Sequence, residues 1–188
     1  MFRYRRKILF EIRKDDWIIS DTHFFHNNII KYCGRPQNHD DLMIYNWNRL
    51  VQPSNRIIHG GDLLWSAKDK FLEILPMLRG EKFILVGGNH DKGKRKFIES
   101  CGFTFLEEKD LTYNKDGIRI LFTHRPIIDN RKIFRGNNVY NVHGHIHEKS
   151  MESSKYINIC VEHYNYRPIQ FSEILKRIRR SKNGSRRC

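Results

Sequence analysis

The chain has 188 residues, of which 39% are hydrophobic and 12% are aromatic. This length and composition fit one folded domain with a hydrophobic core and exclude a disordered chain. No apolar stretch approaches the roughly 20 residues of a membrane span, and the N-terminal residues do not resemble a signal peptide, so we expect a cytoplasmic protein without membrane contact. The four cysteines lie far apart with no CxxC pair, which favours reduced thiols.

The formal net charge of +14 is concentrated at the two ends of the chain. Residues 1–14 hold six Lys or Arg against one Glu, and residues 171–188 hold seven against one Glu. We therefore distinguish a basic N-terminal extension (1–14), a central domain (15–170) and a basic C-terminal helix or tail (171–188). Terminal charge runs are most often solvated extensions. The alternative is contact with the phosphate backbone of a nucleic acid.

Taken in chain order, strands alternate with helices in the first half of the chain, and short strands dominate the second half. The first half is predicted to contain a short strand within 8–12, strands at 17–20, 56–59 and 82–86, a helical turn at 27–32, and helices at 40–50, 66–78 and 92–101. The second half is predicted to contain strands at 103–106, 111–113, 118–122, 139–142 and 156–161 and a helix from Ser172. Ser66 is the predicted N-cap of its helix. Residues 125–138 are polar and predict a surface loop. This order favours a two-sheet α/β sandwich with helices outside.

Five short polar signatures occur along the chain, almost all of them directly after a run of β-forming residues. They are Asp21-Thr22-His23, Gly61-Asp62, Gly88-Asn89-His90-Asp91, Thr123-His124 and Gly144-His145-Ile146-His147. The carboxyl ends of strands are where open α/β sheets bind ligands. Side chains two positions apart on an extended backbone point the same way, so each DxH or HxH pair could approach one ion together. Oxygen and imidazole ligands without thiolate suit Mn²⁺, Fe, Zn²⁺ or Ni²⁺.

Two ions about 3.5–4 Å apart need a bridging anion, and Asp62 at a strand end is the natural candidate. Such a pair polarises a phosphoryl oxygen and makes hydroxide available near neutral pH. Each residue alone has an ordinary structural explanation. Asp62 could form a turn, Asn89 could be a left-handed turn residue, and a single His is usually a surface or core residue. The combination of all of them at strand ends favours a two-metal centre.

This ordered set of motifs resembles the calcineurin-like metallophosphoesterases, whose pattern is DxH, GD, GNHD, a lone His and GHxH. The resemblance implies a four-layer α/β/β/α sandwich of two mixed sheets. It also implies two divalent ions, with Mn²⁺ preferred and Fe, Zn²⁺, Ni²⁺ or Mg²⁺ as alternatives. The ligands implied for the first ion are Asp21, His23, Asp62 and His147, and those for the second are Asp62, Asn89, His124 and His145.

The same resemblance implies roles for residues that do not bind metal. His90 is similar to the family's histidine that contacts the scissile phosphate and protonates the leaving oxygen, and Asp91 would orient it. The strings DTHFFHNNIIKYCGRP, VHGHIH and NYRPI are similar to a small single-domain branch found in bacteria and their viruses. Arg35 and His26 lie in the first string and are candidates for substrate contact. The alternative for Arg35 is a surface residue or a cap at a helix end.

The predicted function is therefore a binuclear metal-dependent phosphoesterase that hydrolyses a nucleotide-type phosphodiester with a metal-bridging hydroxide. One alternative is a nuclease or an RNA- or DNA-end processing enzyme whose basic termini guide a polymer. A second alternative is a non-catalytic scaffold built on the same fold, which the presence of His90 and of a full ligand set disfavours.

Overall fold

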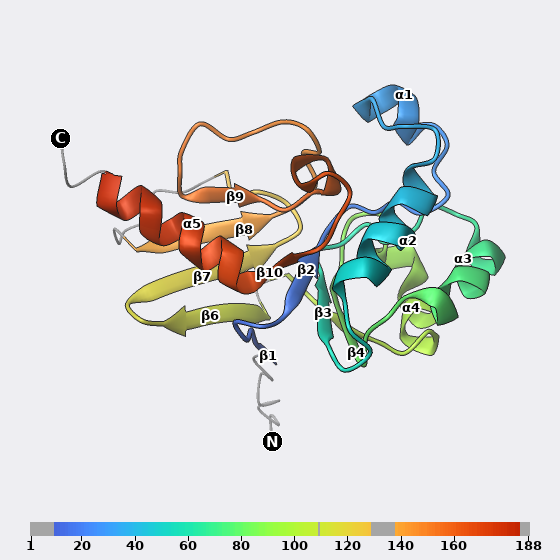
Figure 1. The fold of residues 1–188 in the computed structure, drawn as a ribbon, viewed down its shortest axis with the longest axis horizontal. Coiled ribbons are helices and arrows are strands. Elements are labelled where there is room, and N and C mark those ends of the chain that lie inside the picture. Colours follow the sequence, from blue (N-terminus) through green and yellow to red (C-terminus); the bar gives the residue numbers. More distant parts are fainter. Residues whose placement is uncertain (1–9, 109, 129–137, 185–188) are drawn as a thin grey trace, which may run out of the picture.

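The computed structural model describes residues 10–108, 110–128 and 138–184 (Figure 1). Two five-stranded sheets form its centre, and most of the predicted surface loop at 125–138 lies outside the described residues. Both sheets are mixed, as the predicted fold class requires, and this class is confirmed. Among the described residues, no helix combines the length and the apolar character needed to traverse a bilayer.

The first sheet has the strand order β10-β2-β3-β4-β5. Its strands are β2 (Trp17–Ile19), β3 (Arg56–His59), β4 (Lys82–Val86), β5 (Phe103–Leu106) and β10 (Ile169–Gln170). β2 to β5 run parallel, and β10 is antiparallel at the edge. The parallel strands are mostly apolar along their whole length because both faces of this sheet are covered.

The second sheet has the order β1-β6-β7-β8-β9. Its strands are β1 (Phe10–Glu11), β6 (Leu111–Lys115), β7 (Ile118–Thr123), β8 (Val139–His143) and β9 (Tyr156–Asn158). β7, β8 and β9 are parallel, and β6 forms an antiparallel hairpin with β7. The turn of this hairpin has Asp116 and Gly117 at φ 55° and 65°, the left-handed pair that short hairpins favour.

Short helices cover the first sheet on the side away from the second sheet, where Figure 1 shows α2, α3 and α4. The helices are α1 (Ile29–Cys33), α2 (His39–Leu50), α3 (Lys68–Ile74) and α4 (Arg95–Ser100), with 3₁₀ turns η1 (Leu75–Met77), η2 (Lys92–Lys94) and η3 (Val161–Tyr164). The prediction that Ser66 is an N-cap is wrong. α3 begins at Lys68 after Ala67, and no side chain caps it.

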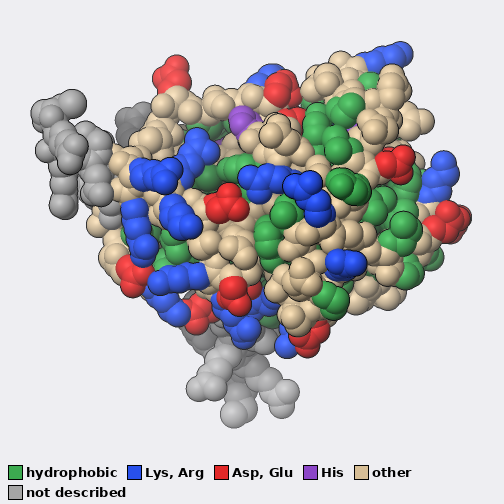
Figure 2. Space-filling model, viewed as in Figure 1, with side chains coloured by type: hydrophobic (Ala, Val, Ile, Leu, Met, Phe, Trp, Pro, Cys, Tyr) green, Lys and Arg blue, Asp and Glu red, His purple; other side chains and the backbone are tan. Residues whose placement is uncertain are grey.

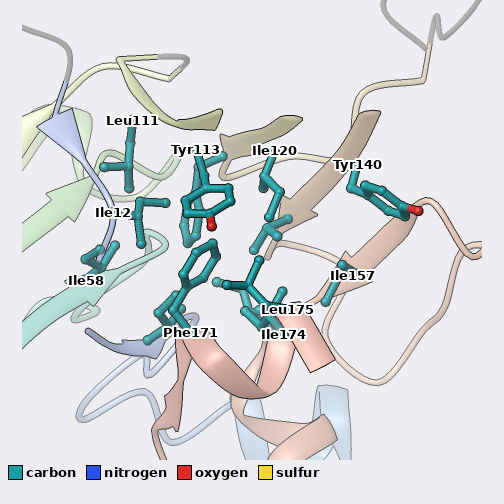
Figure 3. Close-up of a cluster of buried hydrophobic side chains, with 14 of the residues drawn as sticks. Ile12, Ile58, Leu111, Tyr113, Ile120, Tyr140, Ile157, Phe171, Ile174 and Leu175 are labelled. Atoms are coloured by element: carbon teal, nitrogen blue, oxygen red, sulfur yellow. The ribbon is translucent and has the colours of Figure 1, made fainter. Parts of the chain in front are cut away.

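The final helix, α5 (Phe171–Gly184), packs into the core (Figure 3). Its apolar residues Phe171, Ile174, Leu175 and Ile178 are buried in the same cluster as side chains of both sheets. Ile12, within the predicted N-terminal extension, is buried in that cluster too. The basic ends therefore contribute to the central core and are not wholly solvated extensions.

Candidate metal centre

The candidate site lies where the carboxyl ends of strands from both sheets meet. Asp21, Asp62 and Asn89 follow β2, β3 and β4 of the first sheet, whereas His124 and His145 follow β7 and β8 of the second. Backbone contacts join these ends. The N–H of Asp21 donates to the Gly61 carbonyl at 3.0 Å, and Ser20 forms a β-bridge with Cys160 across the two sheets. All seven predicted ligands are therefore carried to one seam of the fold.

The ligand atoms form two groups that meet at Asp62. In one group Asp21, His23 and His147 each offer an atom within 4.8 Å of the others, and Asp62, His124 and His145 do so in the second. The Asp62 Oδ2 lies 3.5 Å from the His23 Nε2 and 3.3 Å from the His124 Nε2. The Asn89 Oδ1 is 3.1 Å from the same His124 nitrogen. Asp62 thus lies between the two groups, within 3.5 Å of a histidine of each.

The backbone at this site is strained in a consistent way. Five of the seven predicted ligands have a left-handed φ: Asp21 (57°), His23 (47°), Asp62 (57°), His145 (71°) and His147 (49°). The expectation that each pair lies on extended backbone is therefore wrong, and the side chains converge through left-handed turns instead. Non-glycine residues in such conformations cost about 1–3 kcal/mol each and cluster where function over-determines the local structure.

Two glycines leave the space that the carboxylates occupy. A Cβ on Gly88 would collide with the Asp62 Oδ1, and one on Gly144 would collide with the Asp21 Oδ2. The glycines of the GNHD and GHxH motifs are therefore needed for close approach of backbone to carboxylate.

Asp21 is fixed by three neighbours, two of which have no signal in the motifs. Its Oδ2 accepts hydrogen bonds from the Ser20 Oγ at 2.5 Å and the Cys160 Sγ at 3.2 Å, and both oxygens accept from the His145 N–H at 3.1 Å. Cys160 comes from the far end of the second sheet, so sequence position alone could not indicate this contact.

Asp91 does not orient His90, contrary to the sequence prediction. Its carboxylate accepts backbone N–H bonds from Asp62 at 2.6 Å, from Gly88 at 2.9 Å and from Leu63 at 3.1 Å. It therefore ties the loop after β3 to the loop after β4 and uses its hydrogen-bonding capacity there. Burial, followed by the charge of Asp62, raises the pKa of this carboxyl.

His23 supplies the test of whether these residues fit a metal ion. Both of its ring nitrogens are buried, and neither has a hydrogen-bond partner among the described residues. Burial lowers its pKa to about 2, so the ring is neutral, as a metal ligand must be. A buried imidazole without partners is costly unless something coordinates it. The donor set fits one or two divalent ions.

Two further histidines have the outer partner that metal-binding imidazoles use. The His124 Nδ1 lies 3.0 Å from the Gly60 carbonyl, which directs its Nε2 toward Asp62. The His147 Nδ1 lies 3.0 Å from the Glu162 Oε1. Burial opposes protonation of both rings, but the hydrogen bond with Asp62 raises the pKa of His124 to about 9. Hydrogen bonds with Cys33 and Glu162 raise the pKa of His147 to about 10.

Arg35 is neither a surface residue nor open to a substrate. Its side chain is fully buried, and it forms an ion pair with Glu162 at 2.6 Å. The same guanidinium donates to the carbonyls of Asp21 at 2.7 Å and Thr22 at 2.8 Å. These partners replace the predicted phosphate contact with a structural one. Arg35 holds the DxH backbone, and Glu162 connects it to His147.

His90 and His26 lie beside the ligands and make no hydrogen bond to them through their rings. The His90 side chain is 37% exposed, and its Nε2 is 3.9 Å from the Asp62 Oδ2, so it stands at the mouth of the site. The Lys94 Nζ fixes its backbone by donating to the His90 carbonyl at 2.6 Å. His26 is buried against Trp65, a residue that the motifs did not single out, with ring centroids 4.0 Å apart.

The chain is similar to a known family and to several known proteins. The sequence model of the calcineurin-like phosphoesterase superfamily domain matches residues 17–161. An uncharacterised protein of Methanocaldococcus jannaschii is 34% identical over 179 residues, covering 88% of this chain and 92% of that protein. A solved structure of a protein of unknown function from Aquifex aeolicus has a TM-score of 0.67 at 31% identity, covering 85% of this chain and 97% of its own. A solved structure of a Pseudomonas putida nuclease has a TM-score of 0.48 at 15% identity, covering 71% of this chain and 62% of the nuclease chain.

Proposed function

Because the chain belongs to the calcineurin-like phosphoesterase superfamily, we propose that it hydrolyses phosphate esters with two divalent ions, preferably Mn²⁺. The observation that carries this proposal is the convergence of seven oxygen and imidazole donors into two groups that meet at Asp62. Asp21, His23, Asp62 and His147 would hold the first ion. Asp62, Asn89, His124 and His145 would hold the second. The proposed substrate is a nucleotide-type phosphodiester.

The residues of the chain supply positioning and a proton. When bound, the two ions would polarise the phosphoryl oxygens and lower the pKa of the attacking water. Asp21 is held rigid by its three donors, so the first group needs little reorganisation. His90 stands half-exposed beside Asp62, where its ring can donate a proton to the leaving oxygen. His90 also disfavours the alternative of a non-catalytic scaffold.

The test compares two isosteric substitutions in Mn²⁺-loaded protein. Asp62→Asn removes the shared charge, and Asp69→Asn makes the same change at an exposed position of α3. We expect Asp62→Asn to lose nearly all turnover of bis(p-nitrophenyl) phosphate and at least one Mn²⁺ per chain, while circular dichroism stays unchanged. Asp69→Asn should match the wild type. Full turnover or full metal content in Asp62→Asn would refute the proposal.

A second candidate function, cleavage of a nucleic-acid strand, is favoured by the outer face of α5. Figure 2 shows Lys and Arg side chains gathered over the part of the molecule where α5 lies. A hollow of about 650 Å³ beside this helix is lined by Lys176, Arg177 and Arg180 together with Gln170, Ser172 and Glu173. Three cations on one helix can neutralise several backbone phosphates of a strand, whereas a small ester offers fewer negative charges.

Charge substitution tests this candidate without removing α5 from the core. Deleting α5 would remove Ile174 and Leu175 from the core, whereas Lys176, Arg177 and Arg180 are exposed. Changing these three residues to Gln should weaken the binding of a single-stranded oligonucleotide. The plot of the logarithm of the binding constant against the logarithm of salt concentration should also become less steep, by up to about 2 in slope, because each neutralised phosphate of a single strand contributes about 0.7. Turnover of a small ester should not change. An unaltered salt dependence would exclude α5 as a nucleic-acid contact.

A further inference from the structure

A row of aromatic side chains lies beside the metal centre and has no part in the mechanism above. The Trp65 ring stacks on His26 with centroids 4.0 Å apart and planes 8° from parallel. The Tyr32 ring meets the His26 ring edge-on, with centroids 6.2 Å apart. Trp65 is also 4.7 Å from the ring of His90, and His26 is 5.8 Å from the ring of His23. The row therefore borders both the proton donor and a proposed metal ligand.

The row is held in place by the same loops that carry the metal ligands. Trp65 stands three residues after Asp62, and its backbone N–H donates to the Phe24 carbonyl at 3.1 Å. A β-bridge between Phe24 and Leu64 fixes the two loops side by side. The Lys94 Nζ adds a hydrogen bond to the Leu64 carbonyl at 3.1 Å. The position of the indole relative to the ligands is thus set by backbone contacts.

Trp65 and Tyr32 are unusually exposed for large aromatic residues. Trp65 is 37% exposed and Tyr32 is 70% exposed, whereas the other two tryptophans, Trp17 and Trp47, are buried. His26, between them, is buried. A rigid indole backed by a buried ring and open to solvent on the rim of a site provides a flat surface at low entropic cost.

A hollow lies between Tyr32, at one end of this row, and two of the proposed ligands. It has a volume of about 350 Å³ and is lined by Tyr32, Cys33, His145, Ile146, His147, Glu148 and Lys149. Tyr32 forms one border, and the ligands His145 and His147 form another. A group attached to a phosphate at the centre can therefore extend along the hollow as far as Tyr32, whereas Trp65 borders the centre on the side of His90.

We propose that Trp65, backed by the buried ring of His26 and bordered by Tyr32, forms a stacking shelf for the base of a nucleotide whose phosphate lies at the metal centre. This inference rests on the proposed function and names its substrate class. Every nucleobase presents a flat π-face, so such a shelf binds bases without strong sequence preference. Alkyl, sugar or glycerol phosphates have no face to stack. The shelf therefore selects esters with a base over esters without one.

The first experiment compares two esters that differ only in the nucleoside. Thymidine 5′-(p-nitrophenyl phosphate) and methyl p-nitrophenyl phosphate share one leaving group. We expect wild-type protein to prefer the thymidine ester in kcat/KM. The ratio of the two kcat/KM values should fall by about 5- to 150-fold in Trp65→Ala, because stacking contributes about 1–3 kcal/mol per base. Trp65→Phe should retain most of the ratio. An unchanged ratio in Trp65→Ala would overturn the shelf.

The role of Tyr32 can be tested against a control tyrosine that lies elsewhere on the surface. Tyr45, on α2, is 63% exposed, close to the 70% of Tyr32. Tyr32→Ala should lower the thymidine-to-methyl ratio, and Tyr45→Ala should leave it unchanged. Equal ratios in the two variants would remove Tyr32 from the shelf.

The second experiment measures binding and requires no turnover. Because Trp65 is the exposed tryptophan, AMP should change the intrinsic fluorescence of the Mn²⁺-loaded full chain, and Trp65→Phe should abolish that change. Ribose 5-phosphate, which lacks the base, should have little effect. A comparable response to both ligands would contradict base stacking. If neither ester is hydrolysed while AMP still quenches Trp65, the proposed reaction fails and the shelf stands.

Discussion

Glu162→Gln tests whether the link between Arg35 and His147 supports both the fold and the metal site. The substitution keeps the shape of the side chain and removes its charge. In the native protein the Glu162 Oε1 accepts from the Arg35 Nε at 2.9 Å and from the Arg35 Nη2 at 2.6 Å, and it lies 3.0 Å from the His147 Nδ1. The other oxygen, Oε2, is buried without a hydrogen-bond partner among the described residues.

The expected magnitude follows from burial. The side chains of Arg35 and Glu162 are 0% and 5% exposed, so removing one charge leaves the other in a poorly solvated place. Breaking such a buried pair costs about 3–5 kcal/mol. Gln keeps one oxygen acceptor and Arg35 keeps its two carbonyl partners, which favours the lower end, about 3 kcal/mol. For a protein of this size that lowers Tm by about 6–12 °C.

Thermal unfolding and Mn²⁺ titration together form the assay. Glu99→Gln is the matched control, because Glu99 also pairs with an arginine, Arg95, but the two side chains are 42% and 48% exposed. It should change stability by less than about 0.5 kcal/mol. Isothermal titration with Mn²⁺ should show an affinity about 10- to 100-fold lower in Glu162→Gln, as expected when an outer partner of a ligand histidine is removed. A Tm and a Mn²⁺ affinity both equal to those of Glu99→Gln would refute this reasoning.

Three further outcomes are expected. His90→Ala should lower turnover most for esters with poor leaving groups. Metal analysis of this variant should still find both ions, because His90 lies next to the proposed ligands and is not one of them. Loss of both ions would contradict this role. Gly88→Ala should destabilise the protein by about 1–3 kcal/mol and weaken Mn²⁺ binding, because the new Cβ collides with Asp62. Thermal unfolding measures the loss. The control Gly93→Ala, whose Cβ would meet open space, should leave Tm unchanged. His124 and His147, with pKa raised to about 9 and about 10, carry protons at pH 7 in the metal-free protein, so Mn²⁺ uptake should release protons and its affinity should rise with pH up to that range. Titration calorimetry in buffers of different ionisation enthalpy measures the number of protons released. Mn²⁺ binding without proton release would exclude protonated His124 and His147 in the metal-free protein.

Much of the fold and the membership of the site can be predicted because the relevant signals are local. Each polar motif follows its strand directly, so one pattern predicts both the strand end and the candidate ligand. The predicted strands at 17–20, 56–59 and 82–86 match β2, β3 and β4 closely. The helix α5 carries a further local signal. Its buried residues 171, 174, 175 and 178 have the spacing of one apolar helix face, which is typical of a helix packed against a core.

The errors concern contacts that only the tertiary structure creates. Glu162, the partner of Arg35, is 127 residues away in the sequence and belongs to no motif. Asp91 lies next to His90 in the chain, yet its carboxylate faces backbone N–H groups of another loop. The left-handed φ of Asp21 is set by the surrounding loops, and the extended geometry inferred from a two-residue spacing does not apply. Adjacency in sequence therefore predicts which residues gather but not which atoms meet.

The seam between the sheets explains why fold and chemistry cannot be separated in this protein. Each proposed ion would draw ligands from both sheets, since Asp21 and Asp62 come from the first and His147 and His124 from the second. Without an ion, the charges gathered there are balanced by protein contacts, chiefly Asp62 with His124 and Glu162 with Arg35. A shift of one sheet relative to the other would break these pairs and separate the ligand groups at once. The same packing that buries the inter-sheet core therefore fixes the distances on which metal binding depends, and the base-stacking shelf inherits that precision because its loops begin at the same strand ends.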